Sequence, residues 1–593
     1  MVHRSENSAP LKIHRNIIHD WVRLQHQLTN SSDVFFIHLP TEQTYIITHF
    51  KENIEKLNAF LNKLHKRSVL CILASSETAL TIIPIIQKYL YFKLWISVKR
   101  EKTISIRNEL PNNHASLLIF TKFKDSLKHC KTQISYTYCP ACKKTTKDYG
   151  GKKHLYSPYG TLISDVWRDI VYKSQGTPES ILSRLSDVFG ITPYRNLFYF
   201  DFRNLASLMP HKKMHKVTIK DKKINLCGES QLINADCLDA LRTIPKNSID
   251  FAFADPPYNI KKKYENWNDG LDIKKYFEWC DRWLNEMTRI LKPGRTVAII
   301  NIPLWVVRHY AFMQNILNFQ TWITWEGLGL PVRKIMPAHY GIICMAKGNS
   351  RGTVGFTDEI NSFTKHYQLN SLKEWYCKRQ SCVRQRNKIS DRESLTDLWW
   401  DIHRIKHNSR RVDHPCQLPP SLMRRLISLY THKGETVLDP FNGAGTTTLV
   451  AHELERKYIG IELSKQYHQL ALERHRDLDI GIDPFAKGKT DPTAKNSRVK
   501  RIKKQNYIIP KKTLQLEVKQ IAEKIGSKPS REDIKKYSSY PIEYFDEYFI
   551  DWGEVCSAVG DKGMNENLYE ETSNSHHVQL KLLEKSKKYV RSA

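Results

Sequence analysis

The amino-acid sequence predicts an α/β protein: a doubly wound, Rossmann-like sheet present in two copies, the first of them degenerate, and then a small all-helical domain. Three observations carry this prediction. Residues 435–463 alternate strand-like and helix-like patterns around a glycine turn, residues 249–254 are an apolar run that ends in a proline-rich loop, and segments of the first 200 residues recur later in the same order. Strands that alternate with helices form parallel sheets covered by helices.

The glycine turn lies in the stretch ETVLDPFNGAGTTTLVAHELERKYIGIEL. It contains, in order, an apolar run, a turn, a helical pattern and a second apolar run (Thr436–Leu438, Phe441–Gly445, Thr446–Arg456 and Tyr458–Ile461). Glycines let a ligand approach the backbone, and a helix start offers free N–H groups. Glu462 follows Asp439 at the distance where an acid holds ribose hydroxyls in such folds. The spacing GxGTT, without a following Lys, disfavours a dinucleotide or a nucleoside triphosphate. A turn that binds nothing is the alternative.

Composition bounds the partners. Lys and Arg exceed Asp and Glu by 93 − 61 = 32 in 593 residues, which favours a polyanion such as nucleic acid over the alternative of a generally basic proteome. No uncharged apolar run approaches the ~18 residues of a membrane span. The 12 scattered cysteines and the absence of a signal-peptide pattern predict reduced thiols and a cytoplasmic location.

Asp255-Pro256-Pro257-Tyr258 follows the apolar run Ile249–Ala254. By itself this loop is also explained as a turn, because Asp and Pro are common turn residues. Together with DPFNGAGTT at 439–447, it resembles the amino-DNA methyltransferases of the β arrangement, in which a DPPY loop precedes a DPFxGxGTT loop. The resemblance implies S-adenosylmethionine as cofactor, double-stranded DNA as substrate and methyl transfer to an exocyclic amine of a flipped base. It also admits a cognate restriction endonuclease as a partner.

The resemblance implies roles for the proline-rich loop. The Asp255 carboxylate and the Pro256 carbonyl would each accept a hydrogen bond from the target amine, while Pro256 and Pro257 stiffen the loop. Tyr258 would stack on the base. An Asp before Pro-Pro-Tyr favours adenine N6. Cytosine N4, or RNA as substrate, is the first alternative, and a non-catalytic DNA-binding protein on the same scaffold is the second.

Cofactor contacts follow from the same resemblance. The glycine loop would lie against the methionine moiety, Glu462 would bind the ribose, and Asp236 would lie near the adenine amine. His414 and Gln417 belong to HPCQLP, which matches a family segment beside the methionine end of the cofactor. The residues of the loop expected to bind the cofactor are Asp439, Phe441, Gly443, Gly445 and Thr446.

The repeat defines the domain organisation. Residues 92–98 match 319–325, Leu110-Pro111 matches Met336-Pro337, the cysteines near 140 match those near 380, and 160–170 match 394–402. Residues 1–210 are therefore predicted to be a diverged copy, so that a monomer acts as a pseudo-dimer; chance similarity of short segments is the alternative. This copy has FIHLP at 36–40 instead of DPPY, and no glycine loop after Trp167.

The remaining boundaries follow from composition and from the resemblance. Residues 211–223 are a linker and 224–478 the catalytic domain, in which 327–395 would recognise the target sequence. Residues 479–511 form a basic linker, 512–570 a helical domain and 571–593 a tail. The helical runs Thr513–Ile525 and Arg531–Tyr537 fit either a helix-turn-helix that binds DNA or a plain appendage.

Cys139-x-x-Cys142 has the spacing of zinc ligands, but one pair is half a site. The other ligands could be Cys130, His154, or the repeat-related Cys377 and Cys382. The last pair, which we select, would tie the two copies together through one ion. Thiols without a metal are the alternative.

Overall fold

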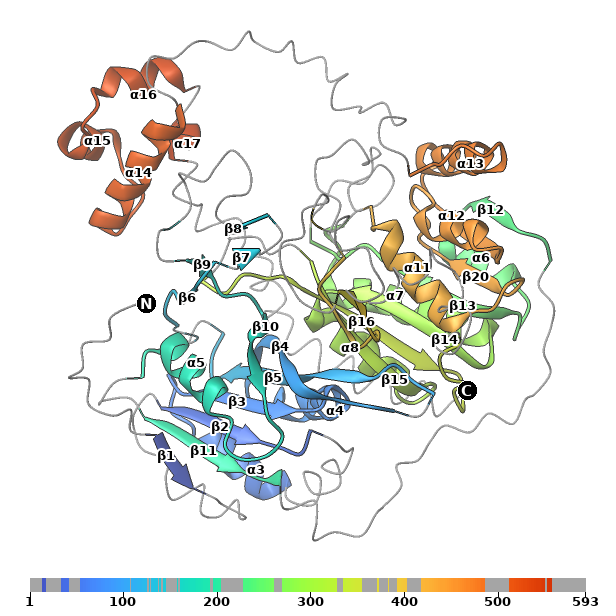
Figure 1. Ribbon diagram of the computed structural model, residues 1–593, viewed down its shortest axis with the longest axis horizontal. Coiled ribbons are helices and arrows are strands. Elements are labelled where there is room, and N and C mark those ends of the chain that lie inside the picture. Colours follow the sequence, from blue (N-terminus) through green and yellow to red (C-terminus); the bar gives the residue numbers. More distant parts are fainter. Residues whose placement is uncertain are drawn as a thin grey trace.

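A computed structural model describes residues 13–16, 33–41, 54–106, 108–124, 127, 129–136, 138–139, 142–145, 157, 160–191, 196–203, 228–260, 269–327, 334–354, 371–372, 382, 392–402, 417–485, 511–549 and 552–556. Two sheets with flanking helices make up most of this part of the chain, and a group of short helices follows them (Figure 1). Among these residues, no helix is both long and apolar enough to cross a membrane.

The N-terminal lobe is built on a seven-stranded mixed sheet in the order β1-β11-β2-β3-β5-β4-β10. Its strands are β1 (Ile13–Asn16), β2 (Val34–His38), β3 (Val69–Ala74), β4 (Tyr91–Ile104), β5 (Asn112–Thr121), β10 (Val166–Tyr172) and β11 (Leu197–Asp201). Its helices are α3 (Ile54–Lys63), α4 (Ser76–Ile86) and α5 (Glu179–Phe189). Between β5 and β10 lie the short strands β6 (Gln133–Ile134), β7 (Tyr138–Cys139), β8 (Lys144–Thr145) and β9 (Thr161–Leu162).

The second lobe has an eight-stranded mixed sheet in the order β12-β21-β20-β13-β14-β16-β15-β19. Its strands are β12 (Gln231–Asn234), β13 (Ile249–Ala254), β14 (Leu291–Asn301), β15 (Asn318–Glu326), β16 (His339–Ala346), β19 (Leu398–Trp399), β20 (Thr436–Asp439) and β21 (Lys457–Glu462). Its helices are α6 (Cys237–Thr243), α7 (Ile273–Ile290), α8 (Pro303–Met313), α11 (Pro420–Tyr430), α12 (Thr446–Glu453) and α13 (Lys465–Asp479). The short strands β17 (Ser371–Leu372) and β18 (Arg392–Glu393) pair with each other.

These elements confirm the α/β class and the predicted order of strand, turn, helix and strand around Asp439. The sheets are mixed, because one strand in each, β5 and β16, runs antiparallel to both neighbours. The predicted helix at 276–291 is α7, which presents its apolar side to the core. The linker 211–223, most of the predicted target-recognition segment 327–395 and the tail 571–593 lie outside the described residues.

The two sheets share one topology over five strands. The series β2-β3-β5-β4-β10 and β13-β14-β16-β15-β19 have the same sequence of parallel and antiparallel pairings. Following the ladders across each sheet matches Trp95 with Trp322, Leu118 with Ile343, Ile72 with Ile299 and Ile37 with Ala254. The next residues along the chain are His38 in the first lobe and Asp255 in the second.

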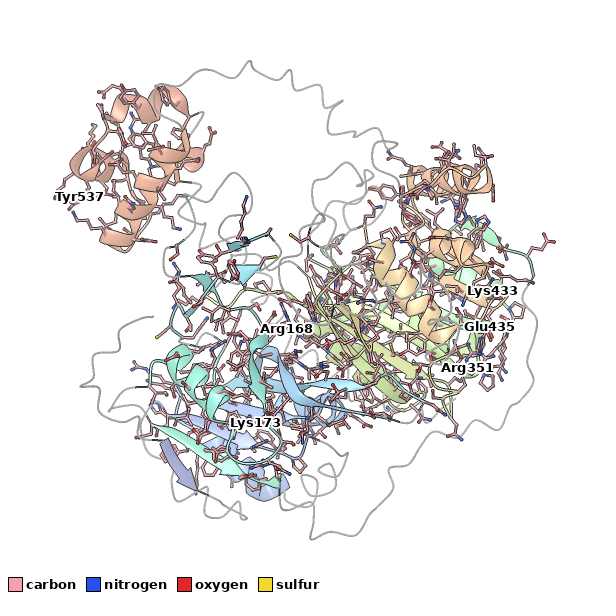
Figure 2. All side chains as sticks on the ribbon, viewed as in Figure 1. Arg168, Lys173, Arg351, Lys433, Glu435 and Tyr537 are labelled. Atoms are coloured by element: carbon pink, nitrogen blue, oxygen red, sulfur yellow. The ribbon has the colours of Figure 1, made fainter. Side chains whose placement is uncertain are left out.

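Equivalent residues of the two lobes meet at their interface. The indole rings of Trp95 and Trp322 stack with centroids 4.1 Å apart and planes 5° apart, and both side chains are buried. Ser97 Oγ and Thr324 Oγ1, two residues further along each strand, are hydrogen-bonded at 2.8 Å. At the edge of the interface, Arg168 forms an ion pair with Glu326 at 2.5 Å (Figure 2).

Two aspartates exchange matching backbone contacts across the same interface. The Asp165 N–H donates to the Met336 carbonyl at 3.1 Å, and the Asp397 N–H donates to the Pro111 carbonyl at 3.0 Å. The Asp165 carboxylate accepts the N–H of His339 at 2.9 Å, while that of Asp397 accepts the N–H of Asn113 at 2.7 Å. Each lobe therefore gives the other the same set of groups, which is the arrangement of a twofold-related dimer.

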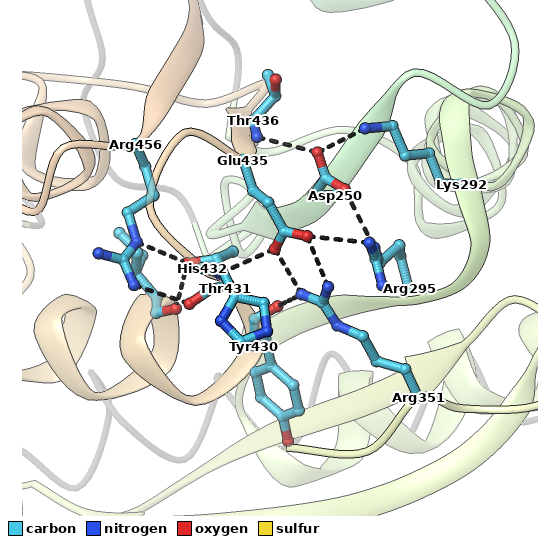
Figure 3. A network of polar contacts seen from close by, with 11 residues as sticks. Asp250, Lys292, Arg295, Arg351, Tyr430, Thr431, His432, Glu435, Thr436 and Arg456 are labelled. Atoms are coloured by element: carbon cyan, nitrogen blue, oxygen red, sulfur yellow. Dashed lines mark hydrogen bonds and ion pairs between the residues drawn. The ribbon is translucent and has the colours of Figure 1, made fainter. Parts of the chain in front are cut away.

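A polar network fixes the ends of β13 and β20 opposite to Asp255 (Figure 3). Asp250 accepts hydrogen bonds from Lys292 Nζ at 2.7 Å and from the Thr436 N–H at 3.1 Å. Glu435, directly before β20, accepts from Arg351 at 2.6 Å and from Arg295 at 2.9 Å. Because buried charged groups need such partners, the network sets the register of β13 beside β20 and so the distance between their carboxyl ends.

The helical domain consists of α14 (Lys511–Ile525), α15 (Arg531–Tyr537), α16 (Ile542–Tyr548) and α17 (Trp552–Val555). The first two confirm the predicted helical runs. Ser530 and Asp533 form a reciprocal capping box at the start of α15. The helices bury a small core of their own, which includes Leu514, Val518, Ile534 and Phe545.

Candidate active site

A cavity of about 1060 Å³, open to solvent, lies at the carboxyl ends of β12, β13, β20 and β21. This is the edge of an open α/β sheet where ligands bind. Both loops singled out in the sequence border it. The residues that line it are Ala235, Asp236, Cys237, Asp255, Pro256, Pro257, Tyr258, Trp279, Gln417, Leu418, Asp439, Pro440, Phe441, Asn442, Gly443, Ala444, Thr446, Thr447, Glu462, Leu463, Ser464 and Tyr467.

The loop after β13 is held from two helices. The Tyr276 hydroxyl on α7 donates to the Pro257 carbonyl at 2.7 Å, and the Trp305 indole N–H on α8 donates to the Tyr258 carbonyl at 2.8 Å. Within the described part of the chain, no hydrogen bond to the Pro256 carbonyl is present. The loop is thus fixed in place while the Pro256 oxygen stays available as an acceptor.

The glycine loop after β20 folds back on two acids. The Phe441 N–H donates to Asp439 Oδ1 at 2.9 Å, and the Gly443 N–H donates to Glu462 Oε2 at 2.7 Å. The Phe441 ring lies edge-on against Trp283 at 5.2 Å and tilted against Trp279 at 5.6 Å. Since Trp279 also lines the cavity, an aromatic wall on α7 supports the loop beside any ligand.

Gly445 has a conformational role in the structure. It does not line the cavity but precedes α12 with φ +84°, a backbone conformation that L side chains rarely adopt. A Cβ at this position would lie 3.0 Å from that of Ala471 on α13. Gly445 therefore lets α12 start beneath the cavity and pack against α13, whereas Gly443 and Thr446 border the cavity itself.

The cavity is acidic. Asp439 is buried, and its burial, reinforced by the charges of Asp255 and Glu462, raises the pKa of its carboxyl to about 7. Burial also raises the pKa of Glu462 above its usual value. Acids that repel one another in a partly dry cavity favour a cationic ligand, because a positive charge relieves the repulsion.

The other predicted cofactor residues divide into two groups. Asp236 lines the cavity and caps α6, its carboxylate accepting the Leu238 N–H at 2.8 Å, and Gln417 lines the cavity just before α11. His414 lies outside the described residues. Trp279, Ser464 and Tyr467 also line the cavity and were not predicted. The apolar stripe of α7, and the two positions shortly after Glu462, are the sequence signals that could have found them.

Of the predicted metal ligands, Cys139, Cys142 and Cys382 come together, with their sulfur atoms all within 4.8 Å of one another. This cluster is separate from the cavity. Cys377 lies outside the described residues.

The N-terminal lobe has a different site at the position equivalent to Asp255. There His38 is fully buried, with Nε2 2.8 Å from the Tyr172 hydroxyl and Nδ1 3.1 Å from that of Tyr199. Burial, together with the charge of Arg203, lowers the pKa of the imidazole to about 3, so it is neutral. Arg203 in turn is bound by Asp201. A closed network therefore stands where the second lobe opens its cavity.

Both loops and their common cavity define a methylase site, and comparison with known proteins agrees. The family model of the N6/N4 type, described as DNA methylase, matches residues 249–473. The type II methyltransferase M.HpaI of Haemophilus parainfluenzae is 32% identical over 252 residues, which cover 42% of this chain and 74% of M.HpaI. The chain therefore belongs to the N6/N4 DNA methylase family, which confirms the resemblance seen in the two motifs.

Other similar proteins share the same part of the chain. M.BamHI of Bacillus amyloliquefaciens is 33% identical over 285 residues, 46% of this chain and 64% of M.BamHI, so the chain spans slightly less than two thirds of that protein. The DNA adenine methyltransferase YhdJ of Escherichia coli (strain K12) is 27% identical over 281 residues, 46% of this chain and 92% of YhdJ. A solved structure of a DNA modification methylase from Thermus thermophilus is 23% identical, covers 41% of this chain and 94% of that one, and has a TM-score of 0.30.

Proposed function

We propose that this chain transfers a methyl group from S-adenosylmethionine to the N6 amine of adenine in DNA. The observation that carries the proposal is the cavity in which Asp255, on its proline-stiffened loop, faces the glycine loop and Glu462. The acidity of the cavity supports the cofactor, because S-adenosylmethionine carries a sulfonium and an ammonium group. Membership of the N6/N4 DNA methylase family supports the reaction class.

The chemistry follows from the two acceptors of the loop. The lone pair of an exocyclic amine is delocalised into the ring, which makes the nitrogen a poor nucleophile. The Asp255 carboxylate and the Pro256 carbonyl, each accepting one N–H, draw this nitrogen toward tetrahedral geometry. The nitrogen then bonds to the methyl carbon as the carbon–sulfur bond breaks, S-adenosylhomocysteine leaves, and the methylated amine loses one proton to solvent.

Tyr258 and the aromatic wall suit a base that has left the duplex. The Tyr258 ring lines the cavity next to Asp255, where it offers a face for stacking. A base inside a duplex hides its amine from such a cavity, so the proposal includes base flipping. For the cofactor we propose Glu462 at the ribose, Asp236 near the adenine amine, and Asp439, Phe441, Gly443, Thr446 and Gln417 along the methionine end.

Adenine N6 is preferred to cytosine N4 for two reasons. Asp rather than Ser precedes Pro-Pro-Tyr, and YhdJ, similar over 92% of its length, is described as a DNA adenine methyltransferase. Labelled S-adenosylmethionine, incubated with the protein and with duplex DNA or RNA, followed by digestion to nucleosides, tests the choice. N6-methyladenosine from DNA is expected in its deoxy form, and labelled N4-methylcytosine alone would contradict it.

We further propose that the N-terminal lobe is a diverged copy of the second, so that one chain acts as a dimer. The shared strand order, the registers that match His38 with Asp255, and the stacking of Trp95 on Trp322 support this origin. The copy would serve as a platform for DNA, and α14–α17 would add a further DNA contact. M.BamHI and M.HpaI are described as type II methyltransferases, which supports a restriction endonuclease as partner.

A further inference from the structure

We propose that Cys139, Cys142 and Cys382 bind one structural zinc ion that joins the two lobes. The three sulfur atoms lie within 4.8 Å of one another. Thiolates that share a tetrahedral zinc at ~2.3 Å are about 3.8 Å apart, so small side-chain movements close the site. Cys139 and Cys382 are buried, and Cys142 is half-buried.

The surroundings of the cysteines favour a metal over simple packing. Cys139 ends β7 and Cys142 lies in the turn before β8, in a hairpin with two residues in each strand. Among the described residues, the buried apolar cluster at this place consists of the three cysteines alone. A two-stranded hairpin without a core is marginally stable, and zinc supplies the folding free energy that such small units lack.

The ligands come from equivalent places in the two lobes. The hairpin belongs to the connection between β5 and β10, and Cys382 belongs to the connection between β16 and β19. These strands correspond in the two sheets. Figure 1 shows β6 to β9 together beyond the end of β10. The ion would therefore tie one lobe's insertion to the segment of the other lobe that we expect to read the target sequence.

Thiolate chemistry selects the metal. Soft sulfur ligands in tetrahedral geometry bind zinc or iron, and hard cations such as Mg²⁺ prefer oxygen. Zinc has no redox chemistry, which suits a joint between lobes remote from the cavity. Cys377, the fourth ligand expected from the sequence, stays a prediction, because it lies outside the described residues.

Metal analysis of the full chain, purified without chelators, tests the proposal independently of any methyl transfer. We expect about one zinc and no iron per chain, and a tetrahedral thiolate spectrum after exchange with Co²⁺. Cys382→Ser should weaken zinc binding at least tenfold. The matched control is Cys130→Ser, because Cys130 is exposed and is not part of the cluster; it should keep the metal.

Several outcomes would overturn the proposal. Fewer than a tenth of chains with zinc and no Co²⁺ uptake would show that the thiols only pack together. Iron in place of zinc, or a Cys139–Cys142 disulfide found by mass spectrometry of freshly isolated protein, would do the same. Full zinc content and unchanged affinity in Cys382→Ser would remove the link between the lobes. Because the Co²⁺ experiment uses the unaltered chain, a variant that fails to fold does not decide the matter.

Discussion

Asp255 and His38 occupy equivalent positions in two sheets of the same topology, yet their surroundings differ in kind. Asp255 borders an open acidic cavity, whereas His38 is enclosed by Tyr172 and Tyr199 and is neutral because burial lowers the pKa of its imidazole. A strand end is thus a place where a site can be built, and the side chains around it decide whether one exists. The lobes keep the same contacts where they meet and differ where a ligand would bind.

Substitution at the two equivalent positions should give the largest contrast. Asp255→Ala removes the proposed amine acceptor and should lower kcat by about 10²–10³, as loss of an oriented hydrogen-bonding group does. His38→Gln, which keeps hydrogen-bonding atoms near both tyrosines, should leave kcat within about twofold. Single-turnover methyl transfer to duplex DNA measures both. Loss of activity in His38→Gln with an unchanged melting temperature would contradict the contrast.

The interface should be the most sensitive structural element that the lobes have in common. Trp95→Ala leaves a large cavity against Trp322 and should cost about 3–5 kcal/mol of unfolding free energy. Trp95→Phe keeps an aromatic ring there and should cost less. Urea unfolding followed by circular dichroism measures the difference. Equal effects of Ala and Phe would show that the stacking of the rings does not hold the lobes together.

Glu462 should matter for cofactor binding more than for stability. Glu462→Gln weakens the acceptor at Gly443 and at the proposed ribose contact, so Kd for S-adenosylmethionine should rise about tenfold, the effect of ~1.4 kcal/mol. Asp201→Asn, in the closed network of the first lobe, is the comparison and should leave Kd unchanged. Isothermal titration calorimetry measures both. An unchanged Kd in Glu462→Gln would remove this acid from the proposed site.

A smaller effect should appear in the pH dependence of cofactor binding. The pKa of Asp439 is raised to about 7, so this carboxyl gains its negative charge as the pH rises from 6 to 8. A cationic cofactor binds the charged form better, and its affinity should rise several-fold over that range. Asp439→Asn should flatten the profile. A Kd that is independent of pH in the unaltered protein would contradict this role.

The same raised pKa predicts a stability profile in the absence of cofactor. The folded carboxyl holds its proton up to a pH of about 7, and the unfolded one only to about 3.8. Its favourable contribution is therefore complete below the unfolded pKa and is lost as pH rises through the folded one. Asp439→Asn should raise the melting temperature at pH 8 more than at pH 5.

Loop motifs and their elements were predictable from the sequence, because Asp255 and Asp439 each follow a short apolar run and precede turn residues. Packing was not. Gly445 looked like a ligand-binding glycine, although its conformation and its closeness to Ala471 explain it. The repeat was detected, but its register was off by one residue: the dipeptides Leu110-Pro111 and Met336-Pro337 match in sequence, whereas the ladders and the interface contacts align Pro111 with Met336. Hydrogen-bond ladders set register, and similarity of two residues does not.

The number of cofactor molecules bound per chain tests most directly whether two similar lobes carry one site. Titration of the protein with S-adenosylmethionine, with its mass in solution measured by light scattering, gives this number. We predict one cofactor per chain and a monomer, with binding lost in Asp439→Ala and kept in Tyr199→Phe. Two cofactors per chain, or a cofactor site retained in Asp439→Ala, would contradict the assignment of the site to the second lobe alone.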